Sequence, residues 1–157
     1  MIARAIAYAS IAALAACQPT TSNSAELARS PAGLEQVALT VASGDKVHRF
    51  TVEIAGSAEE QTIGLMNRAD LAPDRGMIFP FPTPRDASFW MKNTLIPLDI
   101  IFVRTDGSIA NIAANTVPLS LDPVPSEGIV GSVLEIAGGR AAELGIKAGD
   151  KVDWTGR

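Results

Sequence analysis

The sequence predicts a mainly β protein, a compact antiparallel β-sandwich or small barrel with one or two short helices. Three observations favour this fold class. Short apolar or alternating runs recur along the chain, turn-forming residues such as Gly, Pro, Asn and Asp separate most of these runs, and helix signals are confined to two short segments. Many short strands joined by turns are typical of sandwiches and small barrels.

The first two strands are expected at residues 36–42 and 47–54, with a turn signal at residues 43–45 between them. In the second strand apolar and polar side chains alternate, and the single histidine, His48, falls on the apolar side. Such alternation indicates a strand with one buried face. Together the two strands form the start of the domain.

A short helix is expected after the second strand. Ser57 and Glu60 have the spacing of a capping box, in which each side chain accepts a hydrogen bond from the backbone N–H of the other residue. We expect this helix to end near Met66, with Ile63 and Met66 on its buried side. Gly64 weakens it by about 1 kcal/mol relative to alanine, so an early end or a close packing contact is expected there.

The middle of the chain contains two further short strands. Residues 77–81 form a brief apolar strand, and Pro80 inside it indicates a sheet edge or a bulge. Residues 88–91 are expected to form the next strand, which ends at a polar turn made by Lys92, Asn93 and Thr94.

The strand at residues 98–103 is the most informative part of the sequence. Its two faces are Leu98, Ile100 and Phe102 on one side, and Asp99, Ile101 and Val103 on the other. Because both faces are apolar, this strand should be central and covered on both sides. Asp99 is then a carboxylate in an apolar wall, and such a group must be paired, hydrogen-bonded or neutral. We expect Lys92, or the polar groups of Asn93 and Thr94, to hold it.

The C-terminal third continues the same pattern. A turn signal at residues 105–107 leads into a strand at residues 108–114 that pairs back, and the proline-rich residues 116–126 form a surface loop. The remaining expected elements are a strand at residues 129–136, a short helix at residues 139–144 capped by Gly145, and a last strand at residues 150–154.

The N-terminal segment predicts the location of the protein. Residues 1–16 have the pattern of a secretory signal peptide, with one positive charge before an apolar run shorter than the roughly 20 residues that span a bilayer. The segment ends in the letters LAAC, which resemble the lipobox of bacterial lipoproteins, with Cys17 as the acylated first residue of the mature chain. Gln18 is not the aspartate associated with inner-membrane retention. The resemblance therefore implies the outer membrane, facing the periplasm, and secretion to the periplasm if Cys17 is not lipidated.

Residues 17–34 are expected to be the lipidated N-terminus and a flexible tether, and residues 35–157 a single β-rich domain. After cleavage the chain would carry 12 basic and 17 acidic residues, a net charge of −5, which argues against a nucleic-acid partner. Cys17 is the only cysteine, so its acylation leaves no thiol for a disulfide, a zinc site or a nucleophile. We predict no cofactor.

Several short motifs occur in one order along the chain. They are Gly64-Leu65-Met66, Gly76-Met77-Ile78-Phe79, Phe89-Trp90-Met91-Lys92-Asn93-Thr94, Pro97-Leu98-Asp99-Ile100, and Leu144-Gly145-Ile146 with Gly149-Asp150. In this order they resemble the bacterial and archaeal domain of unknown function family 192, over essentially all of residues 35–153. The resemblance implies a compact, mostly antiparallel β-sandwich with few helices. The family has no established activity, so the resemblance implies nothing about function.

The first functional hypothesis is a binding or assembly module for a small molecule or peptide. Its site would consist of Trp90, the turn of Lys92, Asn93 and Thr94, and Asp99, because an aromatic face beside a few polar groups can orient a ligand. The alternative is that Trp90 belongs to the core and that Lys92 simply pairs with Asp99. We predict that the Trp90–Asp99 region carries the function.

Two further hypotheses remain open. In the first, Met66, Met77, Met91 and His48 bind Cu(I), since thioethers and imidazole suit that ion. Methionine is also a common filler of core gaps, which is the structural alternative. In the second, the protein is a hydrolase-like enzyme in which Asp99 is a general base and Lys92 stabilises a developing anion. A structural ion pair between the two residues is the alternative.

Overall fold

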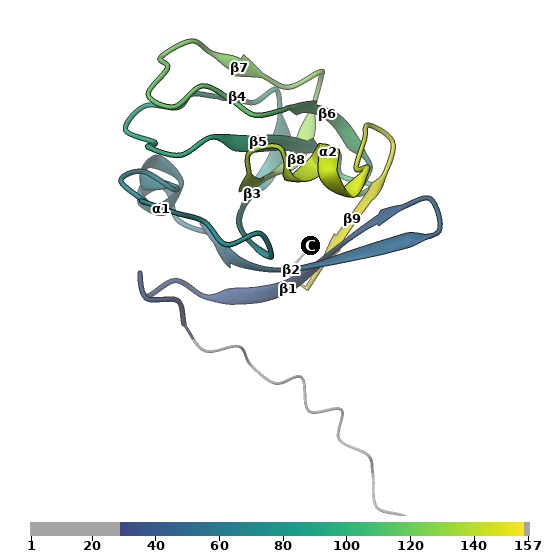
Figure 1. Cartoon of the computed structure of the whole chain (residues 1–157). Helices are drawn as coiled ribbons and strands as arrows, with labels where there is room; N and C mark the ends of the chain where they lie inside the picture. Colours follow the sequence, from purple (N-terminus) through teal and green to yellow (C-terminus); the bar gives the residue numbers. More distant parts are fainter. Residues whose placement is uncertain (1–28, 156–157) are drawn as a thin grey trace, which may run out of the picture.

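The computed structural model of the chain describes residues 29–155 (Figure 1). The predicted signal peptide, Cys17 and most of the predicted tether lie outside the described residues. Along the chain the elements are β1 (Gln36–Ser43), β2 (Lys46–Ile54), α1 (Ala58–Ile63), β3 (Arg75–Arg85), β4 (Ser88–Phe89), β5 (Leu98–Val103), β6 (Ile109–Ala113), β7 (Val124–Pro125), β8 (Val130–Ala137), α2 (Arg140–Leu144) and β9 (Lys151–Trp154). No helix in this part of the chain is both long and apolar enough to cross a membrane.

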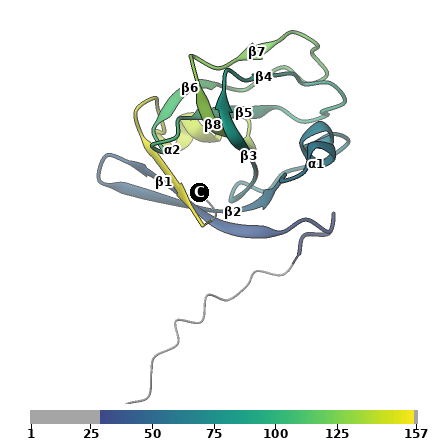
Figure 2. The same cartoon turned by 180° about the vertical axis from the view of Figure 1, so that it is seen from behind.

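Seven strands form one curled sheet in the order β6-β5-β8-β3-β2-β1-β9, and β4 pairs with β7 in a separate small sheet. Neighbouring strands of the large sheet are antiparallel except β2 and β3, which are parallel and are connected through α1. Figures 1 and 2 show the large sheet bent into a half-barrel. The prediction of a mainly β protein with short helices is confirmed. The sheet is mixed and curled, however, and does not form two stacked antiparallel layers.

The strand β5 lies between β6 and β8, and all its residues are buried. The prediction of a central strand covered on both faces is therefore confirmed. The cluster on one face, which we call the α2-side cluster, contains Ile101, Val103, Leu134, Ile136 and Ala141 of α2. The cluster on the other face, which we call the cavity-side cluster, contains Met77, Phe79, Leu98, Ile100, Phe102 and Val133. Two apolar layers thus stabilise one sheet.

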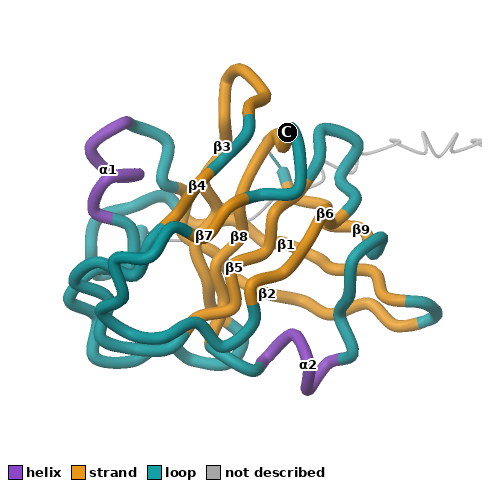
Figure 3. The backbone as a smooth tube through the Cα atoms, turned by 90° about the horizontal axis from the view of Figure 1, so that it is seen from above, coloured by secondary structure: helices purple, strands orange, loops and turns teal. Residues whose placement is uncertain are grey.

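The helix α1 begins as predicted but ends early. Glu60 N–H donates to Ser57 Oγ at 3.2 Å and Ser57 N–H donates to Glu60 Oε2 at 2.7 Å, so the capping box is confirmed. The helix stops at Ile63 because Gly64 takes a φ of 49°, a conformation that favours glycine. The prediction that Ile63 is buried is wrong: its side chain is 52% exposed, and Leu65 beyond the helix packs into the core instead. Figure 3 shows α1 and α2 on different sides of the molecule.

The strand β3 is longer than expected and is not at an edge, since it pairs with β2 and β8. The alternative expectation for Pro80, a bulge, is confirmed by a register shift against β8 between Pro80 and Arg85. Gly76 lets the two strands approach closely, because a Cβ atom there would lie 2.5 Å from the carbonyl oxygen of Glu135. The strand predicted at residues 88–91 is shorter, and the remaining predicted strands and the second helix match within one residue at either end.

The two edges of the curled sheet meet at one end of the half-barrel. The edge strand β9 contacts the turn between β5 and β6 through an isolated bridge between Ser108 and Lys151. Val152 N–H also donates to the carbonyl of Gly107 at 2.8 Å, and Ile109 N–H donates to the carbonyl of Asp150, the residue before β9, at 2.8 Å. This seam closes the sheet at that end.

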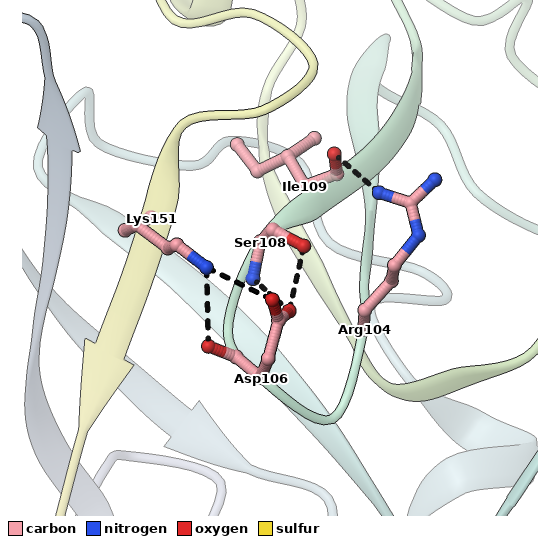
Figure 4. Close-up of polar contacts among 5 residues, drawn as sticks. All are labelled: Arg104, Asp106, Ser108, Ile109 and Lys151. Carbon is pink, nitrogen blue, oxygen red and sulfur yellow. Dashed lines mark hydrogen bonds and ion pairs between the residues drawn. The ribbon is translucent and has the colours of Figure 1, made fainter.

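Asp106 organises the turn at this seam (Figure 4). Its Oδ1 accepts hydrogen bonds from the backbone N–H and the hydroxyl of Ser108 at 2.8 and 2.6 Å, and Lys151 Nζ lies 3.0 Å from its Oδ2. The Ser108 hydroxyl, the Ser108 N–H and Lys151 hold the pKa of Asp106 well below its ordinary value. Arg104 braces the same turn by donating to the carbonyl of Ile109 at 3.1 Å.

Candidate ligand-binding cavity

A cavity of about 320 Å³ lies on the face of the sheet that carries the cavity-side cluster. It is formed by α1 and the turn after it, by β3 and β4, and by the segment before β5. Its lining residues are Ala58, Gln61, Thr62, Ile63, Gly64, Leu65, Met66, Phe79, Phe81, Arg85, Ser88, Phe89, Trp90, Thr94 and Glu135. Most of them come from short or irregular segments, while Phe79, Phe81 and Arg85 of β3 and Glu135 of β8 come from the large sheet.

Glu135 is the buried acid of this cavity. It lies on β8 between Met77 of β3 and Ile100 of β5, and it is only 5% exposed. Within residues 29–155 its carboxyl group has no hydrogen-bond or ion-pair partner. Burial raises the pKa of Glu135 to about 8, because the charged form loses its hydration. The carboxyl group is therefore mostly protonated at pH 7.

Aromatic rings surround this acid. Phe79 and Phe89 pack edge to face with their centroids 5.1 Å apart, and Phe89 makes a similar contact with Phe102 at 6.1 Å. Such pairs stabilise one another beyond the area that they bury, so the walls are well defined. Arg85 places its guanidinium 4.2 Å from the centroid of the Phe81 ring, which brings a positive charge to the edge of the cavity.

The helix α1 is fixed to the sheet at the cavity edge. Gln61 Nε2 donates to the carbonyl oxygens of Ala55 at 3.1 Å and Pro80 at 2.9 Å, which joins the helix to β3. Gly64 lies directly on the Phe79 ring, since a Cβ atom there would be 3.3 Å from the tip of the ring. The bulge in β3 and the glycine after α1 thus both shape the cavity.

The predicted site residues between Trp90 and Thr94 divide into two groups. Trp90, half-exposed, and Thr94, buried, line the cavity, whereas Lys92 and Asn93 do not. Lys92 Nζ lies 5.0 Å from the centroid of the Trp90 ring. Asn93 adopts a left-handed φ of 56°, and its side chain donates to Met66 Sδ at 3.8 Å. Thr94 Oγ1 donates to the carbonyl of Lys92 at 3.3 Å, so the turn is held by its own bonds.

Asp99 is held by groups other than those predicted. It is fully buried on the α2 side of the sheet, and three backbone N–H groups donate to its carboxylate. Asn115 and Gly139 donate to Oδ1 at 2.7 and 2.9 Å, and Ala141 donates to Oδ2 at 2.7 Å. The expectation that Lys92, Asn93 or Thr94 holds this carboxylate is therefore wrong, because the polar turn lies on the other face. Asp99 connects β5 to the start of α2 and does not line the cavity.

Sequence reasoning missed Glu135, although the signal was present. Residues 130–137 form an apolar strand in which Glu135 is the only charged residue. A carboxylate in such a strand is as unusual as Asp99 in β5, and the same argument about buried acids applies to it. Glu135 rather than Asp99 is the acid that lines the same cavity as Trp90 and Thr94.

The methionines proposed as Cu(I) ligands are mainly core residues. Met77 and Met91 are buried in the cavity-side cluster, and Met91 Sδ accepts a hydrogen bond from Thr116 Oγ1 at 3.1 Å. His48 is at the start of β2, where it pairs with Val41 of β1. These contacts favour packing as the role of the methionines. Within residues 29–155 no group of three or more His, Cys, Asp and Glu side chains is placed to hold a metal ion.

The arrangement can do two things chemically. A protonated carboxyl group donates one hydrogen bond and accepts another, so Glu135 can recognise a polar group on a ligand whose remainder packs on the rings. It can also serve as a general acid near neutral pH. The exposed hydroxyl groups in the lining are those of Thr62 and Ser88, and no histidine is among the lining residues.

Fold and cavity together define a class of protein: a mainly β half-barrel with a buried acid in an aromatic cavity. The chain belongs to the DUF192 family, described as "Uncharacterized ACR", whose model matches residues 39–154. The resemblance found in the sequence is thereby confirmed.

Two solved structures resemble this chain. A protein of unknown function from Novosphingobium aromaticivorans is 48% identical, with a TM-score of 0.81, and the match covers 87% of this chain and 99% of that one. A protein from Sinorhizobium meliloti, for which transcription regulation has been proposed, is 36% identical, with a TM-score of 0.77 and a match that covers 79% of this chain and 97% of that one. No curated protein matches.

Proposed function

We propose that this protein is a cell-envelope lipoprotein whose DUF192 domain binds a small organic molecule in the cavity at Glu135. One observation carries the proposal: a carboxyl group with a pKa of about 8, and without a partner among the described residues, lines an aromatic cavity. An unpaired buried polar group destabilises the fold, so its presence in a cavity indicates a functional role.

The cavity defines the chemistry of the ligand. At about 320 Å³ it has the size of the smaller known ligand pockets, so a compact molecule fits better than a long peptide. The rings of Phe79, Phe89 and Trp90 favour a flat or apolar body. The proton of Glu135 favours a hydrogen-bond acceptor on that body, such as a carbonyl oxygen, and Arg85 at the edge favours a neutral or acidic molecule over a cation.

A fragment screen by ligand-observed NMR tests the binding proposal. Acceptor-bearing aromatic fragments should bind at pH 6.5 and bind more weakly at pH 9.5, where Glu135 loses its proton. Glu135→Gln keeps a neutral donor and should bind equally at both pH values. Trp90→Ala should weaken binding, and Glu127→Gln, a change at an exposed site, should leave it unaltered. Binding with the same pH dependence in Glu135→Gln would show that the acid is not the recognition group.

The location is a separate part of the proposal and has its own test. The LAAC sequence supports lipidation at Cys17, with the domain on the periplasmic side of the outer membrane. Radiolabelled palmitate should be incorporated into the wild type and not into Cys17→Ala. Equal labelling of both chains would remove the lipoprotein assignment without affecting the cavity.

Regulation of transcription, proposed for the relative from Sinorhizobium meliloti, finds no support in the composition of this chain. Its 13 basic and 17 acidic residues give a formal net charge of −4. Binding to nucleic acid depends largely on neutralising phosphates with a basic surface. We therefore do not extend that role to this protein.

A further inference from the structure

Exposed apolar side chains gather beside the mouth of the cavity. Of the eight large apolar side chains that are exposed among the described residues, six belong to the cavity lining or to the neighbouring segments that are hydrogen-bonded to one another. We call them the loop patch, and they are Ile63 (52% exposed), Trp90 (49%), Leu95 (51%), Val117 (70%), Leu119 (57%) and Leu121 (65%). Scattered exposed apolar residues are ordinary, but a concentration of them marks a contact surface.

Backbone bonds hold the patch together. Met91 N–H donates to the carbonyl of Ser120 at 3.0 Å, and Leu119 N–H donates to the carbonyl of Thr94 at 3.1 Å. These bonds place the segment around Trp90 and Leu95 beside the loop that carries Val117, Leu119 and Leu121. Ile63 and Trp90 both line the cavity, so the patch continues to the cavity mouth.

We propose that the loop patch is a membrane-contacting surface that inserts into the headgroup region of a lipid bilayer. Its aliphatic side chains are exposed on loops and, for Ile63, at the end of α1, and Lys92 Nζ lies 5.0 Å from the centroid of the Trp90 ring. Tryptophan and lysine suit the boundary between lipid tails and headgroups, because each combines an apolar body with a polar end. The aliphatic residues beside them supply the part that enters the acyl region.

The choice of a bilayer as the partner rests on the proposed lipid anchor. Eleven residues lie between Cys17 and Arg29, the first described residue, and a flexible chain of that length would span roughly 20 Å. An anchored domain would therefore stay within reach of the bilayer, which raises the local concentration of the lipid surface. The chain enters the folded part on the side of α1, whose last residue is Ile63 of the patch (Figures 1 and 2).

Tryptophan fluorescence with phosphatidylcholine vesicles tests this proposal. The protein used is the full chain with Cys17→Ser, which removes the lipid anchor. Trp90 is exposed and Trp154 is buried, so Trp90 is the residue that reports on contact with lipid. Vesicles should shift the emission to the blue, and brominated phosphatidylcholine should quench it. Trp90→Phe should abolish both effects. Glu135→Gln should change neither, so this result is independent of the cavity proposal.

Matched variants identify the surface. Replacing Leu119 and Leu121 together by serine removes the apolar area of two exposed leucines. The affinity for vesicles, measured from the fluorescence shift, should therefore fall at least about tenfold. Val47→Ser and Ile129→Ser alter equally exposed residues outside the patch and should leave the shift unchanged. Val47 is at the β1–β2 hairpin, which projects on the side opposite α1 (Figures 1 and 3).

Three results would overturn the proposal. One is the lack of any blue shift at millimolar lipid, and another is an equal loss in the patch variant and the Val47→Ser control. The third is a blue shift without lipid that grows with protein concentration, which would identify a second copy of the chain as the partner. Circular dichroism of each variant checks that the fold is intact, as expected for changes at exposed positions.

Discussion

Asp99 and Glu135 are buried acids on adjacent strands that face opposite sides of one sheet. Asp99 pairs with Ile136, and Glu135 pairs with Ile100, so the two acids are offset by one residue along the strand pair. Because successive residues in a strand point to opposite faces, this offset separates them. Three N–H groups hold Asp99, whereas Glu135 has no partner within the described residues. Asp99 thus stabilises the fold, and Glu135 is available for a ligand.

The pKa of Glu135 predicts a pH-dependent stability. The unfolded chain releases this proton near the ordinary pKa of 4.5, and the folded chain releases it near 8. Between these values the native state binds more protons, so the free energy of unfolding falls as the pH rises from about 4.5 to about 8. Glu135→Gln removes this loss and should be more stable than the wild type by about 3 kcal/mol at pH 7.

Urea denaturation at pH 5, 7 and 9 measures this effect. The gap between Glu135→Gln and the wild type should widen from pH 5 to pH 9. Glu127→Gln, at an exposed position, should follow the wild type at every pH. A constant gap across the three pH values would show that Glu135 is already ionised in the folded protein.

Asp99→Asn should destabilise the fold by about 2–4 kcal/mol, because the new amide group turns one oxygen acceptor into a donor that faces backbone N–H groups. Hydrogen exchange should speed up at the amides of Gly139 and Ala141, which donate to this carboxylate. Asp70→Asn, at an exposed position, is the control. A midpoint in urea equal to that of the control would contradict the structural role of Asp99.

Glu53 and Arg68 form an ion pair that is expected to stabilise the cavity side of the sheet. Two guanidinium nitrogens of Arg68 lie 3.3 and 2.6 Å from the carboxylate of Glu53, whose side chain is largely buried. Arg68→Met leaves that carboxylate without compensation and should cost about 2 kcal/mol. Adding Glu53→Gln should restore at least half of the loss. A double variant less stable than Arg68→Met alone would show that the pair is not coupled.

The sequence was sufficient for the elements whose signals are local. The capping box of Ser57 and Glu60, the two faces of β5 and the turn at Gly145 each depend on residues close together in the chain. The parallel pairing of β2 and β3 also had a signal. Parallel neighbours are usually connected by a crossover that contains a helix, and the capping box predicted a helix between β2 and β3.

The partners of Asp99 could not be predicted in the same way. Gly139 and Ala141 are 40 and 42 residues away along the chain. They donate through backbone N–H groups, which all residue types except proline have, so their identity gives no signal. Lys92 is the basic residue near Asp99 in the sequence, yet its ammonium group lies over the Trp90 ring on the other face. The apolar pattern of β5 shows that Asp99 needs partners, but residues distant in the sequence supply them.

Asp106 is expected to control local opening of the seam between the β5–β6 turn and β9. Its bonds to Ser108 and Lys151 join the β5–β6 turn to β9, and its pKa is held below the ordinary value of 3.8. Its contribution to stability is therefore present above that pH and is lost as the pH falls below it. Asp106→Ala should accelerate hydrogen exchange at the amides of Ile109 and Val152 at pH 7 while leaving β5 protected. Asp45→Ala, in the turn between β1 and β2, should leave both amides unchanged. Unaltered exchange at the seam in Asp106→Ala would show that the backbone bonds alone close it.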